Sequence, residues 1–448
     1  MLEVILLNAI SLFSSSGIGD LGLRKNNIHT VANCELLPDR MKLFAANHTE
    51  SCNFLGDINE LKNDIINYYN DNFEEELFLV MATPPCQGMS PNGAGKLLSE
   101  FRKGLRPKLD ERNRLIIPSL DIITALRPKW VIFENVPQMR NTVILDERDR
   151  MVNIIDYIRF RLGEDYVGTA EVVDVADYGV PQNRKRLITI FTRSENGKDF
   201  FGINKSFLPQ TTHSQLGEEG KQKWVTVREA IFGLPKLDGQ KGKEKDKDFH
   251  ELHFVNTLDE KKYTWVKHTP EGETAFNNQC INPECEYDGN RRHGATKNKK
   301  DGINKFNTDT PLYCEMCGSL LPRPYVFDNK TGEKRLMKGY TSAYKRMKWD
   351  EPASTLTQNF QYACSDNKLH PEQNRVLSIY EATIIQSISD YDYSFEINGK
   401  MANTGLIRDS IGESVPPKLI DLICRNLISI EKGAHDRFKN SYKQLTFL

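Results

Sequence analysis

The sequence has no long apolar run and almost no net charge. None of its 448 residues lies in a stretch of about 18 consecutive apolar residues, the length that a membrane-spanning helix needs. Lysine and arginine (60) balance aspartate and glutamate (61), so the formal net charge is −1. We therefore expect no membrane partner, and a polyanion would have to bind a local basic patch rather than a generally basic surface.

A secretory leader and a disulfide framework are also missing. The apolar N-terminal stretch MLEVILLNAISLF contains Glu3 and Asn8, and it lacks the basic start and small-residue cleavage site of a signal peptide. The nine cysteines are an odd number, and five of them are scattered. This usage is typical of a reducing compartment. We expect a cytoplasmic protein whose N-terminal stretch forms the first strand of a sheet.

Residues 1–199 alternate short apolar runs with amphipathic stretches. Strands are expected at 9–15, 29–35, 77–83, 129–135, 166–173 and 186–192, and helical spacing is present at 38–47, 59–69, 113–126 and 150–162. This alternation predicts an α/β fold with a parallel sheet and helices on both faces. Ligands of such sheets bind outside the carboxyl ends of the strands.

The remainder of the chain divides into two parts. Residues 200–345 are polar and loop-rich, and residues 291–348 hold 14 Lys and Arg against 5 Asp and Glu. Residues 346–448 return to globular patterning, with an apolar helix expected near 415–430. The pattern predicts a core, an inserted domain and a return to the core.

Residues 81–90, MATPPCQGMS, place one cysteine after an apolar run and two prolines. The prolines fix two φ angles and remove two N–H donors, so they end the strand and direct Cys86 beyond the sheet edge. A cysteine thiolate is a strong nucleophile. A cysteine in an ordinary turn would give the same tripeptide, so this motif alone leaves both roles open.

Two further motifs lie at the ends of predicted strands, one at the end of its strand and the other at the start. Glu134 comes directly after the apolar segment WVIF, where a carboxyl group can protonate an aromatic ring nitrogen. Arg184 and Arg186 alternate in VPQNRKRLITI, which predicts that both lie on one face of a strand. Their guanidinium groups suit a base carbonyl or a phosphate. A loop-capping glutamate and a pair of surface arginines are the alternatives.

A possible adenosine pocket is spread over three strand ends. FSSSGIGD (13–20) is a glycine-rich turn after a strand, Glu35 ends the next strand, and GDI (56–58) ends the third. An acid at the end of the second strand commonly binds ribose hydroxyls. A G-x-G alone is weak evidence, but the three features together have the layout of an adenosine site.

These segments also resemble a known family. FSSSGIGD, CE at 34–35, GDI, PPCQGMS, FENV, QNRKR and GESVPP occur in the order of the cytosine-C5 DNA methyltransferases of bacterial and phage type. The resemblance covers about residues 5–195 and 345–430, and the intervening segment lies where that family has its target-recognition domain. It implies a class I, Rossmann-like methyltransferase fold, S-adenosyl-L-methionine as cofactor and double-stranded DNA as substrate. It also implies that the C-terminal helix packs on the N-terminal part.

The resemblance further implies the roles of the site residues. Cys86 would attack C6 of a cytosine extruded from the duplex, Glu134 would contact N3, and Arg186 with Arg184 would hold O2. The implied cofactor residues are Phe13, Gly17, Ile18, Gly19, Glu35, Leu36, Asp57, Ile58, Pro84, Glu413, Ser414 and Val415. The sequence departs from the family by three serines between Phe13 and Gly17, and by Glu413 in place of an asparagine.

The insertion contains a predicted metal site and a basic stretch. Cys280, Cys285, Cys314 and Cys317 form two close pairs that suit a closed, zinc-ribbon-like Zn²⁺ site. His293 is a possible substitute ligand, and four free thiols are the alternative. Positive residues beside the cysteines suit phosphates. The DNA-binding candidates are Gln87, Ser90, Arg291, Arg292, Arg323, Lys345 and Arg346.

The function predicted from the sequence is cytosine-C5 methylation of a specific duplex sequence, in a restriction–modification or phage-defence system. We expect a monomer that acts alongside a cognate restriction endonuclease. A tRNA-methylating relative is the first alternative, although its Cys-Phe-Thr element is absent. A catalytically silent DNA-binding homologue is the second, and the presence of Cys86, Glu134 and Arg186 argues against it.

Overall fold

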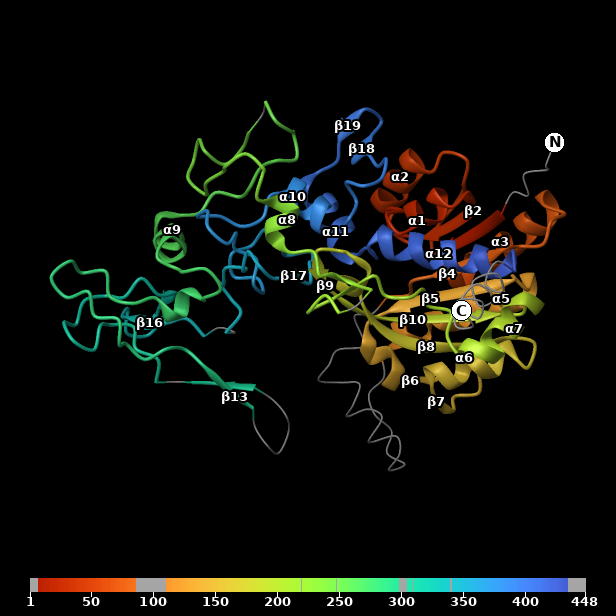
Figure 1. The fold of residues 1–448 in the computed structure, drawn as a ribbon, viewed down its shortest axis with the longest axis horizontal. Helices are drawn as coiled ribbons and strands as arrows, with labels where there is room; N and C mark the ends of the chain where they lie inside the picture. The colour runs from red at the N-terminus through yellow and green to blue at the C-terminus, as the bar shows by residue number, and fades with distance from the viewer. Residues whose placement is uncertain are drawn as a thin grey trace, which may run out of the picture.

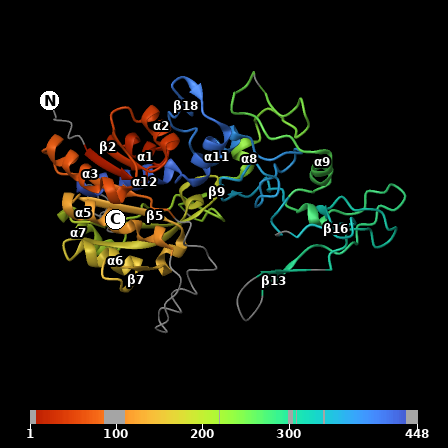
Figure 2. The ribbon, with the colours of Figure 1, turned by 180° about the vertical axis from the view of Figure 1, so that it is seen from behind.

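The computed structural model describes residues 7–85, 110–218, 220–246, 248–297, 304–307, 309–338 and 341–433. An α/β part contains the described residues up to 204 together with the C-terminal helix, and the loop-rich insertion extends from one end of it (Figure 1, Figure 2). Within the described residues, no helix is long and apolar enough to cross a membrane.

A seven-stranded sheet forms the centre of the α/β part, in the order β3-β2-β1-β4-β5-β10-β8. Its strands are β1 (Leu7–Leu12), β2 (Ile28–Glu35), β3 (Cys52–Leu55), β4 (Leu79–Ala82), β5 (Trp130–Asn135), β8 (Val167–Asp174) and β10 (Lys185–Thr192). Strand β10 is antiparallel to both β5 and β8. The prediction of an entirely parallel sheet is therefore wrong at β10. Only residues 175–184 connect β8 to β10, which is too short for a parallel crossover.

Helices cover both faces of the sheet. They are α1 (Asp20–Lys25), α2 (Pro38–Asn47), α3 (Ile58–Asn72), α5 (Ile116–Leu126), α6 (Ile154–Leu162), α7 (Glu195–Asn204) and α12 (Pro417–Glu431). Apolar residues of α3, α5 and α6 form one core with the sheet, and those of α7 and α12 form a second core on the opposite face. Helix α12 lies against α1, and a Cβ atom added to Gly22 would stand 2.6 Å from the Asp421 nitrogen.

The predicted elements form with small changes at their ends. Residues 38–47 form α2 with the expected bounds, because Pro38 fits the first turn of a helix. The expected helix 113–126 starts as a 3-10 helix at Glu111–Leu115 before α5 begins. Residues 151–153 form a strand, and α6 begins only at Ile154, because the Asn153 side chain caps its first turn.

The insertion has short elements, and two further apolar clusters join it to the rest of the chain. Its elements and those of the connecting loops are α8 (Val227–Ile231), α9 (Glu260–Lys267), β6 (Val143–Leu145), β7 (Met151–Asn153), β9 (Gln182–Asn183), β11 (His213–Ser214), β12 (Gln222–Lys223), β13 (Ala295–Lys297), β14 (Asn304–Phe306), β15 (Tyr325–Phe327), β16 (Lys334–Leu336) and β17 (Ala353–Ser354). One cluster surrounds Trp265 and Phe276. The other joins Phe360 to α10 (Ile379–Ile385) and α11 (Thr404–Glu413).

Candidate active site and cysteine cluster

Glu134, at the end of β5, faces Arg186 of β10. Glu134 is paired with Ile188 in the antiparallel register, and Arg186 lies two residues from Ile188 on the same face. Arg186 Nε is 2.8 Å from Glu134 Oε1, and the two side chains are only 13% and 9% exposed. Burial raises the pKa of Glu134 more than the charges of Arg186 and Arg184 lower it. This carboxyl group therefore retains its proton to a higher pH than an ordinary glutamate.

Asn135, which was not singled out from the sequence, connects this pair to the end of β4. Its Nδ2 donates to the Pro84 carbonyl at 2.8 Å, and its Oδ1 accepts from the Val136 nitrogen at 2.8 Å. Its place directly after Glu134 at a strand end was visible in the sequence. The bond fixes the chain two residues before the predicted nucleophile. Cys86, Gln87 and Ser90 themselves lie outside the described residues.

Arg184 does not share the face of Arg186. It stands between β9, which pairs with β17, and β10, which pairs with β5 and β8, so the assumed strand alternation is interrupted there. Its side chain is buried and donates to the carbonyls of Leu356 (2.7 Å), Gly412 (3.0 Å) and Ser414 (2.8 Å). Contrary to the prediction, the guanidinium group joins three chain segments instead of facing a target base.

Glu35 closes β2 and binds the glycine-rich turn. Its Oε2 accepts from the Ser15 nitrogen and its Oε1 from the Leu37 nitrogen, both at 2.9 Å. Each carboxylate oxygen has a second lone pair, so ribose hydroxyls can still donate to Glu35. The neighbouring Leu36 side chain is 62% exposed. An acid beside an exposed apolar surface at the end of β2 fits an adenosine group.

The other predicted cofactor residues differ in which of their atoms a ligand could reach. Phe13 and Gly17 have positive φ angles of 58° and 76°, so the turn is sharply bent. The side chains of Ile18 and Ile58 are buried in apolar clusters, and only their main-chain atoms can reach a ligand. Asp57 is exposed and caps α3 by accepting from the Asn59 nitrogen.

Residues 413–415, the predicted cofactor residues nearest the C-terminus, already contact other parts of the protein. Glu413 Oε2 lies 2.5 Å from Arg40 Nη1, and its Oε1 accepts from the Gln358 amide. The Ser414 carbonyl accepts from Arg184, as described above, and Val415 is buried against the sheet. The role of these residues towards a cofactor stays a prediction, and Glu413 would have to bind an ammonium group in addition to Arg40.

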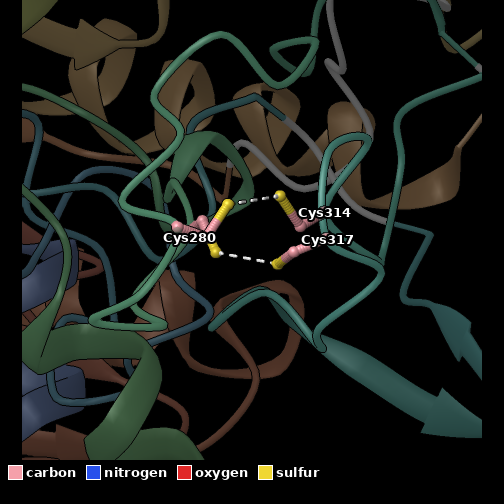
Figure 3. A group of neighbouring side chains, drawn as sticks. Cys280, Cys314 and Cys317 are labelled. Atoms are coloured by element: carbon pink, nitrogen blue, oxygen red, sulfur yellow. Dashed lines mark hydrogen bonds between the residues drawn. The ribbon is translucent and has the colours of Figure 1, made fainter.

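The four cysteines of the insertion lie together. Their sulfur atoms are all within 4.8 Å of one another, with 3.7 Å between Cys280 and Cys317 and 3.9 Å between Cys285 and Cys314. Figure 3 shows the two pairs facing each other from separate loops. Hydrogen bonds from Ser319 lower the pKa of Cys317 to about 6. The four cysteines that the sequence spacing grouped therefore do come together, and four sulfurs at these distances suit a tetrahedral, thiophilic metal ion.

His293 is not part of the cysteine cluster. Its Nδ1 lies 3.0 Å from the Thr310 hydroxyl oxygen, and its ring stacks on Phe276 with 4.9 Å between centroids. The side chain is buried. The substitute role considered for His293 is therefore wrong, and it packs in the core of the insertion.

Two of the predicted DNA-binding arginines are also buried. Arg323 is 0% and Arg346 is 3% exposed, so neither can reach a phosphate in this conformation and both predictions are wrong. Arg323 donates to the carbonyls of Asn278, Arg291 and Pro311, and Arg346 to those of Val266, Thr269, His370 and Gln373. Burial lowers the pKa of both groups to about 10, which leaves them charged at neutral pH. They hold the loops of the insertion together.

Arg291, Arg292 and Lys345 are accessible or half-buried. Arg291 pairs with Glu315 at 2.8 Å, and Arg292 pairs with Glu273 at 3.2 Å. These exposed ion pairs are weak, so both arginines can exchange their partners for phosphates. Their contact with DNA stays a prediction.

Comparison with known proteins agrees with this arrangement. The family model of the C-5 cytosine-specific DNA methylases matches residues 7–429. The chain is 28% identical to the type II methyltransferase M1.HgaI of Avibacterium volantium, over 94% of this chain and 98% of that protein. It is 24% identical to the type II methyltransferase M1.HphI of Haemophilus parahaemolyticus, over 95% and 87%. The structure of the Entamoeba histolytica methyltransferase EhMeth has the same fold, with a TM-score of 0.51 at 11% identity over 94% and 98%. This chain therefore belongs to the C-5 cytosine-specific DNA methylase family and is a DNA cytosine methyltransferase.

Proposed function

We propose that this chain methylates C5 of a cytosine extruded from duplex DNA, through a transient covalent bond between Cys86 and C6. The observation that carries the proposal is the buried Glu134–Arg186 pair, which Asn135 joins to the segment that precedes Cys86. Extrusion places the base beyond the ends of β4 and β5 and costs on the order of a few kcal/mol.

The proposed steps use groups with the required chemistry. The Cys86 thiolate adds to C6 while Glu134 gives its proton to N3, and the resulting enamine carries electron density on C5. When bound, S-adenosylmethionine supplies an electrophilic methyl group for that carbon. A base then removes the C5 proton, the ring double bond re-forms, the N3 proton returns to Glu134 and Cys86 leaves. Arg186 keeps Glu134 oriented and has further N–H groups for the base O2.

Residues at the ends of β1 and β2 fit the cofactor. Glu35 has acceptor capacity left for ribose hydroxyls, and the exposed Leu36 offers an apolar surface to a flat ring. A Cβ atom added to Gly19 would lie 3.8 Å from the Met81 side chain, which is ordinary van der Waals contact. We assign these residues to S-adenosylmethionine.

A methyl-transfer assay tests the reaction. The protein is incubated with labelled S-adenosylmethionine and mixed duplex DNA, and 5-methylcytosine is mapped at base resolution. We expect methylation at one short sequence, DNA binding but no methyl transfer by Cys86→Ala, and no product on tRNA. Product with Cys86→Ala would remove the proposed nucleophile. Product on tRNA but not on DNA would favour the tRNA-methylating alternative.

We further propose that the four cysteines hold one structural Zn²⁺. A tetrahedron with Zn–S bonds of about 2.3 Å has sulfurs about 3.8 Å apart, close to the 3.7 and 3.9 Å found between the facing pairs. Elemental analysis should give one zinc per chain, and Cys317→Ser should lose it. Cys364→Ser, which changes an exposed cysteine outside the cluster, is the matched control and should retain the metal. A folded, metal-free wild-type protein would contradict the assignment.

The biological setting is proposed from the relatives. M1.HgaI and M1.HphI are type II methyltransferases, and we infer that this chain protects host DNA in a type II restriction–modification system. It would act in the cytoplasm as a monomer, alongside an endonuclease that cleaves the same sequence when it is unmethylated. DNA modified by this chain should resist that endonuclease, and cleavage of fully methylated DNA would contradict the pairing.

A further inference from the structure

The serine-rich turn at residues 13–17 has an unfavourable backbone conformation. Phe13 and Ser15 have φ angles of 58° and 49°, in the left-handed region that residues other than glycine seldom adopt. Gly17 also has a positive φ, of 76°. Such a conformation persists only where surrounding contacts hold it, so the contacts of this turn determine the shape that it offers to a ligand.

Side chains of the sheet hold the first half of the turn. Thr83, directly after β4, donates its hydroxyl to the Phe13 carbonyl at 2.9 Å. Asn33 of β2 donates to the Ser14 hydroxyl at 3.1 Å. The Ser15 nitrogen is bound by Glu35, as described above. These contacts come from the same sheet edge as the proposed site.

Two side chains from outside the sheet hold the second half. The Tyr393 hydroxyl donates to the Ser16 carbonyl at 2.8 Å, and His48 Nε2 lies 2.9 Å from the Gly17 carbonyl. A carbonyl only accepts hydrogen bonds, so His48 Nε2 carries the proton. The imidazole also fills the space over Gly17, because a Cβ atom there would stand 2.6 Å from it. Both carbonyls are thus bound by side chains of the protein.

Tyr393 belongs to residues 386–403, which connect α10 to α11 and include the hairpin of β18 (Glu396–Ile397) and β19 (Lys400–Met401). Figure 1 shows this hairpin beside α2. Asn47, near the end of α2, exchanges two hydrogen bonds of 2.8 Å with the main chain of Ser394. Tyr393 is therefore held in place independently of the turn.

We propose that Tyr393, supported by His48, is a positioning residue that holds the 13–17 turn in the conformation that receives S-adenosylmethionine. The inference rests on the proposed cofactor site. Without the Tyr393 hydroxyl, the Ser16 carbonyl loses a buried partner, and the disfavoured φ angles at Phe13 and Ser15 lose one of the contacts that maintain them. The turn then has to be reordered each time the cofactor binds.

Binding of S-adenosylhomocysteine to the full chain, measured by calorimetry without DNA, tests this role. Tyr393→Phe should bind about tenfold more weakly than the wild type, a loss of the order expected for one buried hydrogen bond. Tyr391→Phe is the matched control, because the Tyr391 hydroxyl contacts Asp421 at 3.2 Å and not the turn. The control should bind within about twofold of the wild type, and both variants should bind DNA normally.

A second pair of variants keeps the proposal testable if Tyr393→Phe fails to fold. His48→Gln retains an N–H donor for Gly17 and should keep most of the affinity, whereas His48→Leu should lose it. Unchanged affinity in Tyr393→Phe, or in His48→Leu, would overturn the positioning role. A wild-type chain that binds no S-adenosylhomocysteine would instead overturn the proposed cofactor site, and this role with it.

Discussion

Replacing Glu134 by glutamine separates proton transfer from hydrogen bonding at the end of β5. Glutamine has nearly the same volume, and its Oε1 can still accept from Arg186 Nε, which lies 2.8 Å from the carboxylate in the wild type. It cannot give a proton to N3 of cytosine. Loss of a general acid typically lowers the rate about 10²- to 10⁴-fold, which corresponds to about 3–5 kcal/mol of activation free energy.

Single-turnover methyl transfer with saturating DNA and cofactor is the assay. We expect Glu134→Gln to lose at least about a hundredfold in rate, with DNA and cofactor affinities close to those of the wild type. Because burial raises the pKa of Glu134, the wild-type rate should fall as rising pH removes its proton, and the variant should lack this alkaline decrease. A variant within about tenfold of the wild-type rate would refute the proton-transfer role and leave Glu134 as a partner of Arg186 only.

A stability measurement controls for damage to the fold. The raised pKa means that folded Glu134 binds its proton more tightly than the unfolded chain does. Its contribution to stability is complete below the unfolded pKa and is lost as the pH rises through the folded value. The free energy of unfolding of the wild type, relative to Glu134→Gln, should therefore decrease from acid to neutral pH.

Three further predictions concern other parts of the chain. Burial disfavours the charge of Glu381, but Arg375, 2.7 Å away with both side chains 0% exposed, outweighs it and lowers the pKa to about 2. The stability that this ion pair contributes is present above the unfolded pKa of Glu381 and is lost as the pH falls towards 2. Glu381→Gln should therefore lower the free energy of unfolding at pH 7 by about 3–5 kcal/mol, measured by urea titration. Gly22→Ala should destabilise the contact of α1 with α12 by about 1–3 kcal/mol, whereas Gly202→Ala, with nothing within 4 Å of the added Cβ, should not destabilise α7. Removal of the proposed zinc by a chelator should abolish sequence-specific DNA binding and leave S-adenosylhomocysteine binding intact, as gel-shift and calorimetric assays would detect.

The sheet and the cysteine cluster were predictable because their causes are local. Apolar runs of strand length and amphipathic stretches identified the strands of the sheet other than β3, and the helices of the α/β part other than α1 and α7. Pro38 marked the start of α2. Cysteines in two close pairs have few uses in a reducing compartment other than metal binding. The reversed direction of β10 was also visible in principle, because the short connection after β8 excludes a parallel crossover.

The roles of the arginines were not predictable from charge counts. Arg323 and Arg346 contribute to the basic stretch of the sequence, but their partners are main-chain carbonyls, which no sequence pattern identifies. The sequence prediction put Arg184 on the same strand face as Arg186 because the two residues alternate. That alternation holds only within one strand, and Arg184 lies between β9, which pairs with β17, and β10, which pairs with β8. Tyr393 was missed for a similar reason, since its contact with Ser16 spans 377 positions of the chain.

The proposed chemistry is tested most directly by trapping the covalent intermediate. Duplex DNA that carries 5-fluorocytosine at the methylated position keeps a fluorine where C5 must lose a proton, so the bond between protein and base cannot be released after methyl transfer. The account predicts a DNA–protein adduct that depends on S-adenosylmethionine and maps to Cys86 by peptide mass spectrometry. An adduct on a different side chain, or none while the enzyme methylates unmodified DNA, would contradict it.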